Sequence, residues 1–142
     1  MKYLALDYGT KRVGVAVSDP DGIMAFPRCT LKREIRAVFF EELLALIDAE
    51  RPDAIVLGYP LYNDGSESLT TRQVRNFAAS LKRRVPLPVY YMNEVLSSAD
   101  AEKRLAEAGR DARAIKGVVD RAAAALILES FLSQPESLRK EA

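Results

Sequence analysis

The alternation of apolar and polar residues predicts five strands and four helices along the chain. Two apolar runs flank a tight turn that contains Gly9, so they predict a hairpin. The next strand contains Pro27, which places it at a sheet edge because proline donates no ladder hydrogen bond. The last two strands are short unbroken apolar runs, the pattern of strands buried on both faces. The predicted strands cover residues 2–8, 12–18, 23–31, 54–58 and 88–92.

The helices are predicted from apolar residues that recur at helical spacing. In the first helix the predicted buried face is made of Ile35, Val38, Phe39, Leu43, Leu46 and Ile47. The first three helices are predicted over 33–50, 70–84 and 97–108. The last begins near residues 116–119 and ends at about residue 132. Its apolar stripe of Ala123, Ala124, Ile127 and Phe131 is predicted to pack on the sheet.

This element order predicts an α/β fold with a mixed five-stranded sheet and helices on both faces. Right-handed crossovers give the strand order 3-2-1-4-5, with the second strand antiparallel to its neighbours. The first, fourth and fifth strands then run parallel, and their carboxyl ends share the edge at which α/β proteins bind ligands. Residues 1–134 are predicted to form one domain, and residues 135–142 a polar, flexible tail.

Composition narrows the chemistry to oxygen ligands. The 142 residues include no histidine and one cysteine, Cys29, which is predicted to pack as a small hydrophobe. Histidine-based catalysis, histidine-ligated zinc and an intrachain disulfide are therefore excluded.

No apolar run has the length of a membrane span and no signal peptide is evident, so we expect a cytoplasmic protein with no membrane partner. The net charge is only +1, so affinity for a polyanion would depend on where the charges lie.

Three carboxylates are expected to meet at the carboxyl edge of the sheet. Asp7 and Glu94 end the first and fifth strands, and Asp120 lies near the start of the last helix, beside its apolar stripe. Taken singly, each has an ordinary interpretation: a turn cap, a surface acid and a first-turn acid that favours the helix dipole. Together they would need cations between them, and without His or Cys these would be Mg²⁺ or Mn²⁺. Two such ions roughly 4 Å apart hydrolyse phosphodiesters without a protein base.

Basic residues flank this predicted site. Lys11 and Arg12 closely follow Asp7, while Arg110, Arg113, Lys116 and Arg121 surround the start of the last helix. They suit a nucleic-acid substrate, although solvated surface charge is an equally good interpretation. Tyr62 could stack on a base, but packing is the more common role of a lone loop tyrosine.

The motifs Asp7-Tyr-Gly-Thr-Lys-Arg-Val-Gly-Val-Ala16, Gly58-Tyr-Pro60, Asn63-Asp-Gly65, Glu94 and Lys116-Gly-Val-Val-Asp120 resemble the YqgF (RuvX) family over residues 3–133. The resemblance implies an RNase H-like fold and a metal-dependent endonuclease whose catalytic and metal-binding acids are Asp7, Glu94 and Asp120. It also implies a role in maturing the 5′ end of 16S rRNA, or in resolving Holliday junctions. The matched motifs make Gly9, Thr10, Lys11, Arg12, Asn63 and Lys116 candidate substrate-binding residues.

The match to the family pattern is incomplete beside the second acid. The family has Asp-Glu-Arg there, whereas this chain has Asn93-Glu94-Val95. A flanking acid and an arginine suited to contact phosphate are thereby replaced, which bears on substrate preference and rate more than on the fold.

Two other functions fit parts of the pattern. Actin-like ATPases and sugar kinases use a similar first hairpin. They bind ATP between two such domains, whereas this chain is predicted to form one, so a homodimer would be needed to form a comparable cleft. A non-catalytic RNA-binding ribosome-assembly factor would accommodate the altered residues around Glu94. The partner in either nucleic-acid case is structured RNA or branched DNA. A monomer or a homodimer is compatible with the sequence, and two coordinated cuts in a junction would need the dimer.

Overall fold

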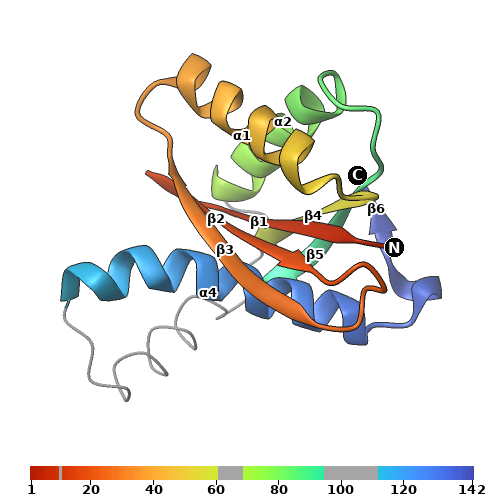
Figure 1. Ribbon diagram of the computed structural model, residues 1–142. Coiled ribbons are helices and arrows are strands. Elements are labelled where there is room, and N and C mark those ends of the chain that lie inside the picture. The colour runs from red at the N-terminus through yellow and green to blue at the C-terminus, as the bar shows by residue number, and fades with distance from the viewer. Residues whose placement is uncertain (10, 61–68, 95–111) are drawn as a thin grey trace.

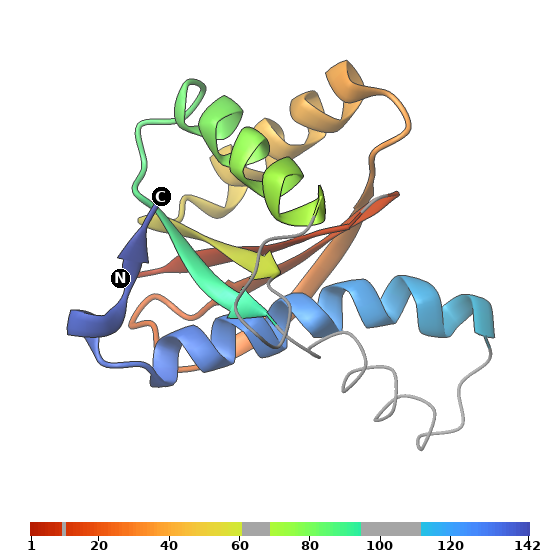
Figure 2. The same ribbon diagram turned by 180° about the vertical axis from the view of Figure 1, so that it is seen from behind.

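The chain folds into one six-stranded sheet with helices on both faces (Figures 1 and 2). This computed structural model describes residues 1–9, 11–60, 69–94 and 112–142. Helices α1 and α2 cover one face and α4 covers the other. The strands are β1 (Tyr3–Tyr8), β2 (Arg12–Ser18), β3 (Ala25–Lys32), β4 (Ala54–Pro60), β5 (Val89–Glu94) and β6 (Lys140–Glu141). The helices are α1 (Arg36–Glu50), α2 (Leu69–Lys82), α4 (Ala112–Ser133) and the short 3₁₀ helix η1 (Glu136–Leu138).

The strand order is β3-β2-β1-β4-β5-β6, which confirms the predicted order of the first five strands. β2 is antiparallel to β1, whereas β4 is parallel to β1 and β5 is parallel to β4. The carboxyl ends of β1, β4 and β5 therefore lie along one edge of the sheet, as predicted. The predicted helix over 97–108 lies outside the described residues.

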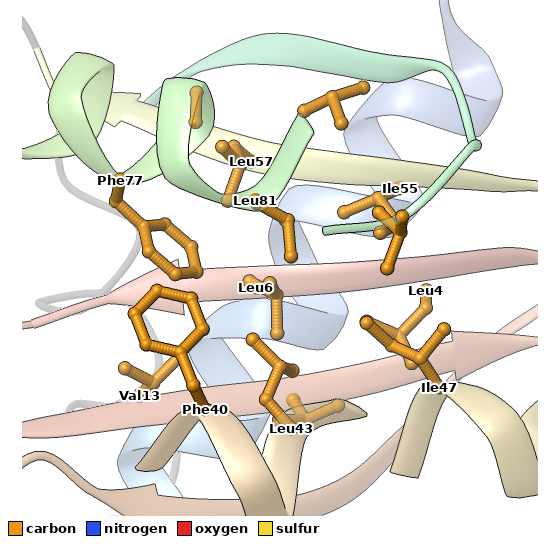
Figure 3. Close-up of a cluster of buried hydrophobic side chains, with 14 of the residues drawn as sticks. Leu4, Leu6, Val13, Phe40, Leu43, Ile47, Ile55, Leu57, Phe77 and Leu81 are labelled. Atoms are coloured by element: carbon orange, nitrogen blue, oxygen red, sulfur yellow. The ribbon is translucent and has the colours of Figure 1, made fainter. Parts of the chain in front are cut away.

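The larger core lies between the sheet and helices α1 and α2 (Figure 3). Leu4 and Leu6 of β1 point into it and are fully buried, together with Leu57 of β4. The prediction for α1 was wrong at two positions: Ile35 is 62% exposed and Val38 is 44% exposed. Ile35 precedes the first helical residue, Arg36, so helical spacing does not apply to it. The buried face of α1 is narrower than predicted and consists of Phe39, Phe40, Leu43 and Ile47.

The second core lies between the sheet and α4, and it uses smaller side chains. Ala123, Ala124, Ile127 and Phe131 are buried there, which confirms the predicted stripe. The sheet side of this core includes Ala5 of β1 and Ala16 of β2. Because both surfaces carry alanines, the helix can lie close to the strands. α4 begins at Ala112, a few residues before its predicted start.

The last residues of the chain form structure that the sequence did not predict. Residues 135–142 were predicted to be a flexible tail, but η1 and β6 lie within them, and β6 pairs antiparallel with β5. The backbone N–H of Ala142 donates to the carbonyl of Val89 at 2.7 Å. Pairing with an open sheet edge therefore orders a segment that has no apolar pattern of its own. No helix in the described ranges is long and apolar enough to cross a membrane.

We expect an ion-pair cluster at Glu50 to make stability depend on pH in the acid range. Glu50 accepts hydrogen bonds from Arg28 Nε at 2.7 Å and Lys2 Nζ at 3.0 Å. The bond from Arg28, followed by that from Lys2, lowers the pKa of Glu50 below its usual value. A depressed carboxyl pKa contributes stability above the unfolded-state pKa, and this contribution is lost as the pH falls through the folded-state pKa.

The measurement is the free energy of unfolding by urea from pH 7 down to pH 3 for the wild type and Glu50→Gln. The wild type should lose about 0.5–1 kcal/mol more than the variant over the acid part of this range. Parallel pH profiles would show that the cluster contributes nothing through the charge of Glu50.

Candidate active site

Asp7 lies near the carboxyl end of β1, on the side of the sheet that α4 covers. Side chains alternate along a strand, and Tyr3 and Ala5 of β1 both belong to the α4-side core. Asp7 follows in the same phase and is half-buried. Its neighbour across the sheet in β2 is Gly14. The carboxylate is thus at the margin of the core, at the carboxyl edge of the sheet.

The backbone of α4 approaches the sheet very closely at Gly14. A Cβ placed on Gly14 would lie 1.8 Å from the carbonyl oxygen of Asp120 and 2.9 Å from the backbone nitrogen of Arg121. Only glycine leaves room for this contact, because both obstructing atoms are backbone atoms. Since Gly14 pairs directly with Asp7, the contact holds Asp120 beside the strand that carries Asp7. The structure therefore places the backbone of Asp120 against the residue that pairs with Asp7.

Arg12 fixes the side chain of Asp120. Its Nε donates to Oδ2 of Asp120 at 2.5 Å, in an ion pair whose two side chains are 38% and 21% exposed. Arg12 begins β2 two residues before Gly14, so it projects from the same face of the strand. The sequence identified Arg12 only as a substrate-binding candidate. No local pattern in the sequence signals the ion pair, because the contact depends on how closely α4 approaches β2.

Glu94 is the last residue of β5, and it pairs with Pro60 at the end of β4. The backbone of all three predicted strand ends is therefore at the same edge of the sheet. The side chain of Glu94 lies outside the described part of the structure. Among the side chains that are described, no group of three His, Cys, Asp or Glu residues is close enough to hold a metal ion.

The turn between β1 and β2 is built around Gly9. Its N–H donates to the carbonyl of Arg12 at 2.9 Å, and a Cβ there would lie 2.6 Å from that same oxygen. Lys11, at the tip of the turn, is exposed. The turn thus presents a cation immediately beyond Asp7.

Several candidates identified from the sequence fall outside what the structure describes. Thr10, Tyr62, Asn63 and Arg110 lie outside the described residues, and Lys116 and Arg113 are described only as backbone positions within α4. Their predicted contacts with substrate stay predictions. Arg121 is half-buried beside the Gly14 contact.

Cys29 does not belong to this site. It lies in β3, on the side of the sheet covered by α1 and α2, and packs against the larger core. Burial raises the pKa of its thiol. Both observations agree with its predicted role as a small hydrophobic residue, since a reactive cysteine requires a lowered pKa.

Comparison with known proteins assigns the family. The family model described as "RuvX: Holliday junction resolvase" matches residues 1–134. The chain belongs to the RuvX family. A RuvX relative from Nitratidesulfovibrio vulgaris strain Miyazaki F is 58% identical over 142 residues, covering 100% of both chains, and is named "Putative pre-16S rRNA nuclease". A relative with the same name from Oleidesulfovibrio alaskensis is 54% identical over 98% of this chain and 96% of its own.

Two solved structures superpose on this RuvX chain over nearly its whole length. RuvC of T. thermophilus in complex with a Holliday junction superposes with a TM-score of 0.60 at 16% identity, covering 100% of this chain and 99% of that one. Fowlpox virus resolvase bound to junction DNA gives a TM-score of 0.51 at 10% identity, over 94% and 97% of the two chains. At these identities the likeness establishes the RNase H-like fold alone.

Of the two residues beside Glu94 that depart from the family pattern, the structure describes Asn93. Asn93 is exposed and pairs with Tyr59 of β4, so it continues the ladder between β4 and β5. Val95 lies outside the described residues. The Asn93 replacement therefore changes the charge of the edge while β5 keeps its pairing.

Proposed function

We propose that this protein is a divalent-metal-dependent endonuclease that matures the 5′ end of pre-16S rRNA by hydrolysing a phosphodiester bond. The observation that carries the proposal is the backbone contact between Gly14 and Asp120, which holds Asp120 against the strand paired with Asp7. Membership of the RuvX family and the name of its 58% identical relative support the nuclease class and the RNA substrate. They also favour this function over ATP binding between two domains.

The donor set fits a hard divalent cation. Asp7 and Asp120 offer carboxylate oxygens, which Mg²⁺ and Mn²⁺ prefer. Glu94 would be the third ligand, because its position in β5 is in phase with Tyr90 and Met92, which pack on the α4-side core. The chemistry that the bound cations supply is activation of the attacking water and stabilisation of the leaving oxygen.

The remaining residues orient the acids and the substrate. Arg12 binds Oδ2 of Asp120 and so fixes the orientation of that carboxylate. Lys11 extends from the adjacent turn and would neutralise a substrate phosphate, while the Gly9 turn allows the backbone to come close to the nucleic acid. Two-metal catalysis and these substrate contacts are parts of the proposal.

Holliday junction resolution is the second candidate function, because the matching family is described as a resolvase. The two functions differ in stoichiometry. Resolving a junction needs two coordinated active sites, hence a dimer, whereas trimming an RNA end needs one. A cytoplasmic location, predicted from the sequence, accords with either function.

The test is side-by-side cleavage of a precursor 16S rRNA fragment and a synthetic Holliday junction with Mg²⁺, with Mn²⁺ and with EDTA, accompanied by light scattering for molar mass. We expect metal-dependent cleavage of the RNA at a defined position and no cleavage in EDTA. Efficient junction cleavage by a stable dimer would instead establish the resolvase function. Binding of RNA without cleavage under any metal condition would identify a non-catalytic assembly factor.

A further inference from the structure

A basic pocket lies on the opposite side of the sheet from α4, beside the same carboxyl edge. It has a volume of about 470 Å³ and is bounded by the end of β1, the start of α1 and one side of α2. Its lining includes Arg33, Arg36 and Arg83, and none of the described residues that line it is acidic. The pocket is therefore suited to an anion.

A buried serine brings two of these arginines together. Ser80 of α2 is 5% exposed, and its Oγ accepts hydrogen bonds from Arg36 Nη2 at 3.1 Å and Arg83 Nη2 at 3.2 Å. Arg36 begins α1 and Arg83 directly follows α2, so the shared acceptor joins the two helices. Both arginines are exposed, and each guanidinium has further N–H groups beyond the one that Ser80 accepts.

The third arginine is held against the turn that follows Asp7. Arg33 places its guanidinium carbon 3.9 Å from the ring centre of Tyr8 and donates to the carbonyl of Gly9. The Tyr8 ring also stacks on Phe77, with centroids 4.3 Å apart and planes 7° apart. Two groups this close cannot share one face of the ring, so both faces of Tyr8 are covered. The Tyr8 ring thus lines the pocket but has no uncovered face on which a base could stack.

A second basic hollow shares one lining residue, Arg33, with the pocket. It measures about 240 Å³. Its other lining residues are Lys11, Arg12, Lys32 and one acid, Glu34. Arg12 is the residue that pairs with Asp120. Cationic side chains therefore run from the proposed active site, across the turn between β1 and β2, to the Arg36–Arg83 pair.

We propose that this pocket binds the backbone phosphates of a single nucleic-acid strand that continues from the cleavage position over the β1–β2 turn. Guanidinium groups bind phosphate oxygens through paired hydrogen bonds, and two of them converge here on one serine. With Tyr8 covered on both faces, recognition is through phosphate and is independent of base sequence. The inference rests on the proposed nuclease function, since it names where the substrate strand lies beyond the active site.

The test measures binding of a fluorescently labelled single-stranded RNA oligonucleotide by anisotropy, in EDTA to prevent cleavage, over a range of KCl concentrations. The variants are Arg36→Ala, Arg83→Ala, the double variant and Arg36→Lys. The control is Lys140→Ala, which removes one exposed positive charge from β6 and leaves the pocket intact.

We expect the double variant to bind about tenfold more weakly, and the slope of log K against log salt to fall by roughly 0.7 for each arginine removed. Arg36→Lys should keep the salt slope but lose part of the affinity, because a lysine cannot form the paired contact. Lys140→Ala should bind as the wild type does. A cooperative thermal unfolding transition would show that the variants are folded, and a small loss of stability is expected because the Ser80 contact joins α1 and α2.

The outcomes separate this inference from the proposed function. If the wild type cleaves RNA but the double variant binds it as tightly as the wild type, the pocket inference is wrong and the nuclease function stands. If the wild type cleaves nothing while the arginine variants still lose RNA binding, the nuclease function fails and the pocket stands. Inorganic phosphate and a nucleoside monophosphate serve as competitors. If the double variant keeps its affinity for RNA but no longer binds inorganic phosphate or the nucleoside monophosphate, the pocket takes a free anion and the strand inference is overturned.

Discussion

Asp7→Asn is expected to lower the rate of phosphodiester cleavage by at least about 1,000-fold while the protein stays folded. The substitution keeps the shape of the side chain and removes its negative charge, which is what a hard divalent cation binds. Loss of metal-assisted stabilisation of the transition state costs several kcal/mol, and each 1.4 kcal/mol corresponds to tenfold in rate. Asp7 is half-buried, and asparagine has nearly the same size and shape, so the substitution opens no cavity in the core.

The measurement is single-turnover cleavage of the substrate that the wild type cuts, in saturating Mn²⁺, together with urea unfolding of both proteins. Asp19→Asn is a matched control. Asp19 lies just after β2 and accepts backbone hydrogen bonds from Ile23 and Met24, both at 2.7 Å. Removing the charge of Asp19 should alter the stability of the protein and leave the cleavage rate of the folded protein unchanged. Equal rates for Asp7→Asn and the wild type would remove Asp7 from the active site.

Much of the fold followed from the sequence because its strands carry their own signals. Runs such as Ala54–Leu57 are apolar at every position, which occurs when both faces of a strand are covered, and right-handed crossovers then determine the strand order. β6 could not be found in this way. It has two residues, both exposed, and depends on the free edge of β5 for its hydrogen bonds. A local pattern carries no information about a partner that lies about fifty residues earlier.

Within the predicted site, the positions of the acids could be found from local sequence pattern, whereas the contacts that depend on packing could not. The positions of Asp7 and Glu94 at strand ends followed from topology, and Asp120 followed from its place beside an apolar stripe. The ion pair of Arg12 with Asp120 was not predicted, because it joins residues separated by 108 positions and depends on how closely α4 approaches β2. The Arg36–Ser80–Arg83 contact likewise depends on the packing of two helices. Polar contacts of this kind require the three-dimensional structure.

Gly14→Ala is expected to destabilise the protein by about 3 kcal/mol and to reduce cleavage by the molecules that remain folded. The added methyl group would overlap the carbonyl oxygen of Asp120, 1.8 Å from the new Cβ. Side-chain rotation cannot relieve this overlap, because the obstructing atoms belong to the backbone of α4. Overpacking of a tight contact typically costs 1–3 kcal/mol, and we place this change at about the upper limit because only a shift of the whole helix can relieve the overlap.

The functional consequence distinguishes this glycine from an ordinary packing position. For α4 to accommodate the methyl group it must move away from β2, which carries Asp120 away from Asp7 and stretches its 2.5 Å ion pair with Arg12. Urea unfolding reports the loss of stability, and single-turnover cleavage under fully folding conditions reports the loss of alignment. Asp7→Asn should lose cleavage alone, whereas Gly14→Ala should lose both. A Gly14→Ala protein with normal stability and normal cleavage would mean that α4 does not rest on β2 at this point, and the proposed pairing of Asp7 with Asp120 would have no structural basis.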